Sequence, residues 1–372
     1  MLNSLTIKNF KCFEKQRVSL RALTLLAGLN GMGKSTVLQA LLLLKQSRDQ
    51  FFLPVAGIAL NGEYTHVGTA KDALFEGASD ENISFEIEFS SGLKALWQFA
   101  YEAGDSESNL MSLNTEPESE KTYTENLFAR SFRYLPAERI GPRPVFPISE
   151  HEVYWDLSIG KNGEFATQFL ALHGSKDLQT NTLLHPKADS HKLRDQVEAW
   201  LGEISPGARL HATSYSELEA ARLEFSFLIG DQLTKKYRST NVGFGLTYVL
   251  PIIVAVLSAE QGSLFLVENP EAHLHPKGQV QIGRLLALAA MSGIQVIVET
   301  HSDHVLNGIR LAVCRKEVKP TDIQLHFFER SPKNKLDTHV ISPEILETGR
   351  LNFWPEGFFD EFDKTLAELV SK

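Results

Sequence analysis

The chain has 372 residues, of which 43% are hydrophobic, enough for a large core and for one large domain or two. Its formal net charge of −9 argues against a protein that binds nucleic acid with its whole surface, so such binding would need a local basic patch. The two cysteines, Cys12 and Cys314, lie far apart in the sequence and imply no disulfide framework, which fits a reducing cytoplasm.

The first elements in chain order are predicted to be strands followed by a helix. Residues 2–28 alternate between polar and apolar and then run apolar, which is typical of a hairpin leading into a buried strand that ends near Ala27. Residues 34–47, KSTVLQALLLLKQS, have helical spacing and contain no helix breaker. Residues 83–100 alternate on either side of Ser91–Gly92, which predicts a second hairpin.

The middle of the chain is predicted to be mixed in structure. Residues 102–121 are acidic and rich in serine and predict an exposed loop. Residues 133–147, RYLPAERIGPRPVFP, predict an ordered but irregular connector. Residues 190–204 predict an amphipathic helix, and residues 222–229 and 233–240 predict a further hairpin.

Three strongly apolar stretches follow. LTYVLPIIVAVLSA, residues 246–259, is too short to cross a bilayer, which needs about 20 residues, and is predicted to be a buried helix. SLFLVE and IQVIVET, residues 263–268 and 294–300, are apolar without alternation, as in a parallel sheet covered on both faces. The start of the chain shows no signal-peptide segment, so we expect a soluble cytoplasmic protein with no membrane partner.

The end of the chain has an amphipathic pattern. In WPEGFFDEFDKTLAELV, residues 354–370, an apolar face is formed at helical spacing by Phe358, Phe362, Leu366 and Leu369. This pattern predicts a terminal helix docked on the core. A surface that docks a partner is the alternative, because aromatic residues dominate the hot spots of interfaces.

The strongest motif is GLNGMGKST, residues 28–36, which fits the phosphate-binding pattern G-x-x-x-x-G-K-[ST] between a predicted strand and a predicted helix. Gly31 and Gly33 allow backbone N–H groups to turn toward phosphates, and the helix N-terminus adds partial positive charge. Lys34 can reach the β- and γ-phosphates, and the hydroxyl of Ser35 can ligate Mg²⁺.

Two later strand ends carry residues that suit the same chemistry. Glu268 ends an apolar strand, where a carboxylate can hold the Mg²⁺ shell. His301 follows the next apolar strand and could donate a hydrogen bond to the γ-phosphate. Thr300, Ser302 and Asp303 are also good helix-capping residues, and the two roles are compatible.

A fourth motif, STNVGFGLTYVLP, places Asn241, Gly243 and Gly245 before the long apolar helix. Such a stretch can present backbone N–H groups and a helix N-terminus to an anion. Because the phosphate loop already holds one nucleotide, this site would most naturally face a nucleotide bound to a second subunit. A flexible loop before an ordinary helix start explains the stretch equally well.

With these four motifs, the chain resembles the ABC-type ATPases of the RecF, SMC and OLD-nuclease group. More narrowly, it resembles the small AAA-family ATPases of bacterial anti-phage defence operons, of the Septu kind. The resemblance covers nearly the whole chain, through IKNFKCF, GLNGMGKST, YLPAERIGPR, NVGFGL, VENPEAHLHP, VETHSDH and WPEGFFDEF.

The resemblance implies an α/β fold: an ABC-type P-loop ATPase head with a mixed or parallel core sheet, an antiparallel β subdomain and an inserted helical region. Residues 1–100 and 235–335 would form the head. Residues 101–234 would form an inserted lobe with the acidic loop and helices, and residues 336–372 a helical tail packed on the head.

In that group, ATP and Mg²⁺ are held between two subunits, with the phosphate loop of one facing the signature loop of the other. The resemblance therefore implies that nucleotide is bound by Lys11, Asn30, Gly31, Gly33, Lys34, Ser35 and Thr36 and, from the second subunit, by Asn241, Gly243 and Gly245. It implies that Ser35 and Glu268 hold Mg²⁺. It places in the catalytic region Glu268, Asn269, Glu271 and His301.

Asn269 departs from the pattern of the group. ABC ATPases commonly place Asp and then Glu at this strand end, and the Glu polarises the attacking water. An amide cannot accept a proton as a carboxylate can, so general-base help worth roughly 10²–10⁴-fold is lost unless Glu271 or Glu299 supplies it. Phosphoryl transfer depends mainly on positioning and charge stabilisation, so slow hydrolysis is compatible with Asn269.

The favoured hypothesis is an ATP-gated homodimer, or a higher assembly, that regulates a separate effector such as a nuclease or a toxin in anti-phage defence. Two alternatives stay open: a RecF-like DNA-binding clamp in DNA repair, and a scaffold that binds ATP without hydrolysing it. For nucleic acid, the candidate contacts are Arg133, Arg139 and Arg143 with Tyr134. Buried pairing of an arginine with Glu138 is the structural alternative.

Overall fold

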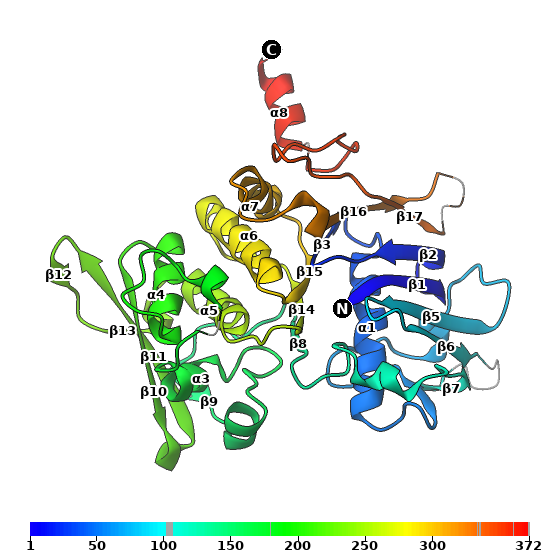
Figure 1. Cartoon of the computed structure of the whole chain (residues 1–372), viewed down its shortest axis with the longest axis horizontal. Coiled ribbons are helices and arrows are strands. Elements are labelled where there is room, and N and C mark those ends of the chain that lie inside the picture. The colour runs from blue at the N-terminus through cyan, green and yellow to red at the C-terminus, as the bar shows by residue number, and fades with distance from the viewer. Residues whose placement is uncertain (102–106, 179, 333, 335, 360, 371–372) are drawn as a thin grey trace. The chain divides into compact units, whose positions relative to one another are not determined.

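The computed structural model describes residues 1–101, 107–178, 180–332, 334, 336–359 and 361–370, and the chain divides into two compact units (Figure 1). Unit 1 consists of Met1–Phe132, Thr321–Leu346 and Leu351–Lys372. Unit 2 consists of Arg133–Pro320 and Glu347–Arg350. Residues 235–320 thus fall in the same unit as residues 133–234.

Unit 1 contains an antiparallel sheet with the strand order β2-β1-β5-β6-β7-β4. The strands are β1 (Leu2–Phe10), β2 (Phe13–Ser19), β4 (Gly57–Ala59), β5 (Asn82–Phe89), β6 (Lys94–Ala100) and β7 (Leu110–Thr115). The two predicted hairpins are both present, as β1–β2 and as β5–β6. The second turns at Gly92, whose φ of 86° favours glycine.

Unit 1 also contains the strand and the helix that flank the phosphate loop. β3 (Leu23–Gly28) pairs in parallel with β16 (Ile323–Arg330), which pairs antiparallel with β17 (Thr338–Ile341). The interior of β3 is fully buried. α1 (Lys34–Asp49) packs against β1 and β4, as Figure 1 shows, and a single-turn helix, α2, spans Ala70–Ala73.

The predicted acidic loop at residues 102–121 is wrong in part, because it contains β7. Met111 is buried, and β7 pairs with both β6 and β4. The apolar side chains of the LMSL segment therefore outweigh the polar composition around it. Residues 102–106 lie outside the described part of the chain.

The carboxyl-terminal tail forms the predicted helix, α8 (Glu361–Val370). Phe358, which precedes it, is fully buried and packs on Phe327 with ring centroids 5.3 Å apart. Leu366 and Leu369 are 48% and 70% exposed, so these two side chains do not dock on the core as predicted. The side chain of Phe362 lies outside the described residues.

Unit 2 combines parallel strands, helices and a second antiparallel sheet. Three strands pair in parallel in the order β15-β14-β8: β8 (Arg133–Leu135), β14 (Leu264–Glu268) and β15 (Gln295–Glu299). The sequence predicts the parallel arrangement of β14 and β15. The helices are α3 (Ala166–His173), α4 (Leu193–Ile204), α5 (Phe244–Leu257), α6 (Pro276–Met291) and α7 (Asp303–Cys314). The antiparallel strands are β9 (Phe146–Pro147), β10 (Ala208–Tyr215), β11 (Ala220–Ile229), β12 (Gln232–Leu233) and β13 (Tyr237–Arg238).

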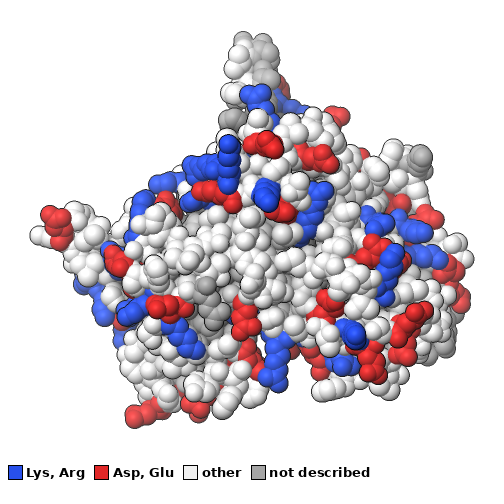
Figure 2. All heavy atoms as spheres, in the orientation of Figure 1, with Lys and Arg blue, Asp and Glu red and all other residues white. Residues whose placement is uncertain are grey.

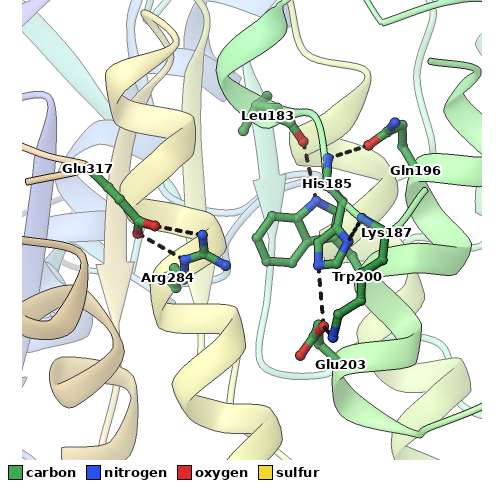
Figure 3. A network of polar contacts seen from close by, with 8 residues as sticks. All are labelled: Leu183, His185, Lys187, Gln196, Trp200, Glu203, Arg284 and Glu317. Atoms are coloured by element: carbon green, nitrogen blue, oxygen red, sulfur yellow. Dashed lines mark hydrogen bonds and ion pairs between the residues drawn. The ribbon is translucent and has the colours of Figure 1, made fainter. Parts of the chain in front are cut away.

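A polar network joins residues 183–203, which include most of α4, to α6 (Figure 3). The indole of Trp200 on α4 donates to the carbonyl oxygen of Leu183 over 3.4 Å, and the ring of His185 packs edge-on against it. The guanidinium of Arg284 on α6 lies 5.8 Å from the centre of the Trp200 ring and donates two hydrogen bonds to Glu317. These contacts explain why residues 181–204 belong to the same compact unit as α6.

The apolar helix α5 is buried from Leu246 to Leu257 within the protein. Among the described residues, no helix combines the length and the apolar character needed to cross a bilayer.

Candidate nucleotide-binding site

The phosphate loop connects β3 to α1 in unit 1, as the motif requires. Gly28, Gly31 and Gly33 all have positive φ values, of 138°, 75° and 95°. A Cβ atom at Gly28 would lie 2.4 Å from the carbonyl oxygen of Phe328, and one at Gly33 would lie 2.7 Å from the Sγ atom of Cys12. Glycine is therefore needed at both positions, and the backbone has the turned conformation of a phosphate cradle.

Lys34 lies at the mouth of this loop. Its Nζ atom donates to the carbonyl oxygens of Gly28 and Leu29 over 2.9 and 2.8 Å, and the side chain is buried. α1 begins after Gly33 with no side-chain cap and no acidic residue in its first turn, so its partial positive charge is not neutralised there. The loop surface is completed by three exposed residues, Asn30, Gly31 and Ser35.

Two residues near the loop have local partners that the sequence did not reveal. The Nζ atom of Lys11 donates to Oε1 of Gln39 over 2.9 Å, and burial lowers the pKa of Lys11. Lys11 therefore lies along α1, beyond its first turn. The hydroxyl of Thr36 accepts a hydrogen bond from the thiol of Cys12. The structure thus gives both side chains a packing role beside the loop.

In unit 2, the ends of β14 and β15 place two acidic residues opposite each other, Glu268 and Glu299. The carboxylate of Glu268 accepts one hydrogen bond from the hydroxyl of Tyr134 over 2.8 Å and one from the backbone N–H of Ala137 over 3.2 Å. Burial, together with the negative charge of Glu268, raises the pKa of Tyr134 far above its usual value. Tyr134 therefore stays a neutral hydrogen-bond donor.

Asn269 has a conformation and an environment that set it apart. Its φ of 42° is left-handed, which asparagine tolerates better than most residues, and its N–H donates to the carbonyl oxygen of Glu299 over 2.8 Å. Its Oδ1 atom is buried, and none of the described residues donates a hydrogen bond to it. This oxygen is an acceptor that a water molecule could satisfy.

Glu271 links the segment after β14 to the segment after β15. Its carboxylate accepts hydrogen bonds from the hydroxyl of Thr300 over 2.7 Å and from the backbone N–H of His301 over 2.9 Å. Ser302 caps α7 by accepting from the N–H of Val305, which confirms the capping interpretation. The ring of His301 is exposed just before this cap, so both interpretations of the segment remain compatible.

Two of the three arginines of residues 133–147, Arg133 and Arg139, have structural roles. Arg139 is buried and donates to the backbone carbonyl oxygens of Glu268 and Asn269 over 2.6 and 2.8 Å, and no Glu138 partner is among the hydrogen bonds of the described residues. Arg133 is held by Ser258 and neighbouring carbonyl oxygens. Both guanidinium groups are thus engaged by groups of unit 2. On the face drawn in Figure 2, the described basic and acidic side chains are interspersed.

The two glycines of the signature segment, Gly243 and Gly245, have different environments. Gly243 is exposed at the N-terminus of α5, and a Cβ atom there would meet no other atom within 4 Å. A Cβ atom at Gly245 would lie 2.5 Å from the carbonyl oxygen of His273. Phe244 packs against the ring of His273, with centroids 4.4 Å apart and the rings tilted by 54°. Gly245 thus allows close packing, while Asn241 and Gly243 remain on the surface.

The comparisons with known proteins agree with these motifs. A family model described as "AAA domain, putative AbiEii toxin, Type IV TA system" matches residues 23–307, more than half of the chain. The chain belongs to this AAA family. Residues 318–369 match a second model, described as "Protein of unknown function (DUF3696)". No curated protein matches the chain.

Solved structures of SMC head domains share the fold of this AAA protein. One is an SMC head bound to the C-winged helix domain of ScpA, with 13% identity, a TM-score of 0.54 and coverage of 92% of this chain and 98% of that chain. Another is an SMC head domain with an extended coiled coil bound to the C-terminal domain of ScpA, derived from Pyrococcus furiosus, with 11% identity, a TM-score of 0.50 and coverage of 100% and 99%. These likenesses confirm the predicted α/β fold of an ABC-type ATPase head.

The residues present have the chemistry that a magnesium nucleotide requires. Mg²⁺ prefers oxygen ligands, and the hydroxyl of Ser35 and the carboxylate of Glu268 are such ligands. Unit 1 brings together the loop glycines, Lys34 and Ser35, and unit 2 brings together Glu268, Asn269, Glu271 and His301. Three residues of the segment YLPAERIGPR support Glu268 in a way that the sequence did not predict: Tyr134, Ala137 and Arg139.

Proposed function

We propose that this AAA protein binds Mg²⁺-ATP, dimerises around two nucleotides, hydrolyses them slowly and thereby regulates a separate effector in anti-phage defence. The observation that carries the proposal is the conformation of the phosphate loop. At Gly28 and Gly33 a side chain would clash with the surrounding protein, and Lys34 lies buried at the loop mouth. Such a loop is built to cradle phosphate oxygens with backbone N–H groups.

In this proposal each residue acts by position and charge. Lys34 neutralises phosphate charge, Ser35 and Glu268 hold the cation, and the imidazole of His301 donates toward the γ-phosphate. When bound, Mg²⁺ would supply charge neutralisation at the phosphates. The backbone N–H of His301 is fixed by Glu271, which supports a set position for this residue.

Slow hydrolysis follows from Asn269. Its buried Oδ1 atom can accept a hydrogen bond and so orient a water molecule, but an amide cannot take the proton. Orientation without general-base help retains part of the rate enhancement, because positioning and charge stabilisation carry most of phosphoryl transfer.

The exposed signature segment supports dimerisation. Gly243 lies at the N-terminus of the 14-residue helix α5, with no acidic residue in its first turn, so this end of the helix can face an anion on a second copy. The similar SMC heads are bound to domains of ScpA, which supports a head that acts on a separate partner protein. The family description names a putative toxin and a Type IV TA system, which supports a role in defence.

Two measurements on purified protein test the proposal. Binding of a fluorescent ATP analogue and the molar mass by light scattering are measured with and without Mg²⁺-ATP for the wild type, Lys34→Ala and Lys15→Ala. Lys15 is an exposed lysine of the same unit and serves as the control. The wild type and Lys15→Ala are expected to bind the analogue and to double in mass with Mg²⁺-ATP. Lys34→Ala is expected to do neither, and nucleotide binding equal to the wild type would contradict the proposal.

A scaffold that binds ATP without hydrolysing it is the second candidate function, favoured by the amide of Asn269. It predicts the same dimer and the same loss in Lys34→Ala, but no phosphate release by the wild type. The DNA-clamp hypothesis loses two of its candidate contacts, because Arg133 and Arg139 are engaged within unit 2.

A further inference from the structure

We propose that Tyr134 is a positioning residue that holds the carboxylate of Glu268 for Mg²⁺, and that this contact makes the site require Glu rather than the shorter Asp. The inference rests on the proposed function, because it assumes that Glu268 serves a magnesium nucleotide. It adds a residue that the phosphate-binding motifs do not include.

The position of Tyr134 follows from strand register. β8 pairs in parallel with β14, with Tyr134 opposite Leu266, two residues before Glu268. Tyr134 is only 9% exposed, and its hydroxyl reaches forward along the strand to donate to Oε1 of Glu268 over 2.8 Å. The neighbouring strand therefore delivers a hydrogen-bond donor to the end of β14.

The second carboxylate oxygen of Glu268 is held by the turn after β8. The backbone N–H of Ala137 donates to Oε2 over 3.2 Å. Arg139 fixes this turn to the end of β14, because its Nη1 atom donates to the carbonyl oxygens of both Pro136 and Glu268, over 2.7 and 2.6 Å. The hydroxyl of Tyr248 also donates to the carbonyl oxygen of Ala137. These hydrogen bonds join the turn to the strand end, and we call Tyr134, Ala137 and Arg139 the clamp on Glu268.

The clamp explains how a glutamate can serve where ABC ATPases commonly carry an aspartate. The glutamate side chain has one more rotatable bond, so an unsupported carboxylate would take up several orientations. One donor on each oxygen selects one orientation. A carboxylate has about four lone-pair sites, so both oxygens keep acceptor capacity for a cation or its water shell. An aspartate is one methylene shorter and would lose at least one of the two donors.

The test measures Mg²⁺ dependence rather than turnover. A fluorescent ATP analogue is titrated with Mg²⁺ for the wild type, Tyr134→Phe, Glu268→Asp, the double variant and Tyr215→Phe, an exposed tyrosine of the same unit. Tyr134→Phe removes only the hydroxyl, and loss of one hydrogen bond to a charged group should raise the Mg²⁺ half-saturation about tenfold. Glu268→Asp should raise the Mg²⁺ half-saturation by a similar factor. The half-saturation of the double variant should exceed that of either single variant by less than threefold. Tyr215→Phe should match the wild type.

The melting temperature without nucleotide shows whether a variant is simply unfolded. An unchanged melting temperature together with a raised Mg²⁺ half-saturation supports a positioning role. Loss of a merely structural residue would instead lower the melting temperature. A Tyr134→Phe half-saturation within twofold of the wild type would overturn the inference, and so would Mg²⁺ dependence of Glu268→Asp equal to the wild type. If Tyr134→Phe does not fold, Glu268→Asp alone decides between these results. Failure of the wild type to bind the analogue at any Mg²⁺ concentration would instead overturn the proposed function itself.

Discussion

The carboxylate of Glu271 accepts a hydrogen bond of 2.9 Å from the backbone N–H of His301. Its other oxygen accepts from the hydroxyl of Thr300 over 2.7 Å. These contacts fasten the segment after β14 to the segment after β15. They favour Glu271 as the residue that positions His301, beside its alternative role as the general base.

The variants Glu271→Gln and Thr300→Val separate these two roles. If Glu271 positions His301, both variants weaken the same link, and phosphate release should fall about tenfold in each while binding of the ATP analogue is kept. If Glu271 is the base, Glu271→Gln should abolish release and Thr300→Val should leave it nearly intact. Full release by Glu271→Gln would contradict both roles.

Asn269→Glu tests how the amide limits the reaction. The added carboxylate should raise phosphate release by tenfold or more, since general-base help is typically worth roughly 10²–10⁴-fold. The left-handed backbone, with φ of 42°, should make this variant less stable by about 1 kcal/mol, measured by urea denaturation. Asn269→Gln, which carries the same strain without a base, is the control. Equal release by the two variants would rule out a general-base effect at this position.

The signature glycines should respond in opposite ways to substitution. Gly243→Asp should keep or raise the stability of the protein, because aspartate is a good N-cap residue and nothing lies within 4 Å of the new Cβ atom. It should nevertheless abolish dimerisation by Mg²⁺-ATP, since its charge would repel the phosphate. Light scattering and thermal melting measure the two effects.

Gly245→Ala is the matched variant in the same segment. Its Cβ atom would lie 2.5 Å from the carbonyl oxygen of His273, so it should destabilise the protein by about 1–3 kcal/mol. If Gly243→Asp still dimerised with Mg²⁺-ATP as the wild type does, the signature role of Gly243 would be wrong.

His326 should make the protein less stable in mild acid. Its ring is buried between the carbonyl oxygen of Ser19 and the hydroxyl of Ser342, and burial lowers its pKa from 6.5 to about 4. The unfolded chain therefore takes up this proton first as the pH falls below 6.5. The linked free energy of unfolding should drop by about 2 kcal/mol between pH 7 and pH 5.

Urea denaturation at several pH values checks this expectation against His326→Gln, which cannot take up the proton. The variant is expected to be less stable at pH 7, because it loses packing, but to show a smaller change between pH 7 and pH 5. An equal change in both proteins would mean that His326 contributes nothing to the pH dependence.

The sequence was sufficient to predict the elements that carry the motifs. Continuous apolar runs ending at Ala27, Glu268 and Thr300 mark buried strands, and a glycine-rich or polar turn follows each of them. Because buried strands and their following turns are encoded locally, the phosphate loop, Glu268 and His301 all lie at strand ends as predicted.

The sequence was not sufficient where long-range packing decides. The contact of Tyr134 with Glu268 depends on the register of β8 against β14, and no local pattern encodes a pairing of strands so far apart. The packing of α4 against α5 and α6 joins segments that lie far apart in the sequence, and it too has no local pattern. β7 was not predicted, because the acidic and serine-rich composition of residues 102–121 outweighed the short apolar segment around Met111.

The most direct test of the central claim is phosphate release under multiple turnover with Mg²⁺-ATP, compared between the wild type and Lys34→Ala. The account predicts slow but repeated release by the wild type and none by Lys34→Ala, because only the intact phosphate loop can hold and neutralise the phosphates. Release by the wild type no greater than by Lys34→Ala would contradict the claim that this AAA protein is an ATPase.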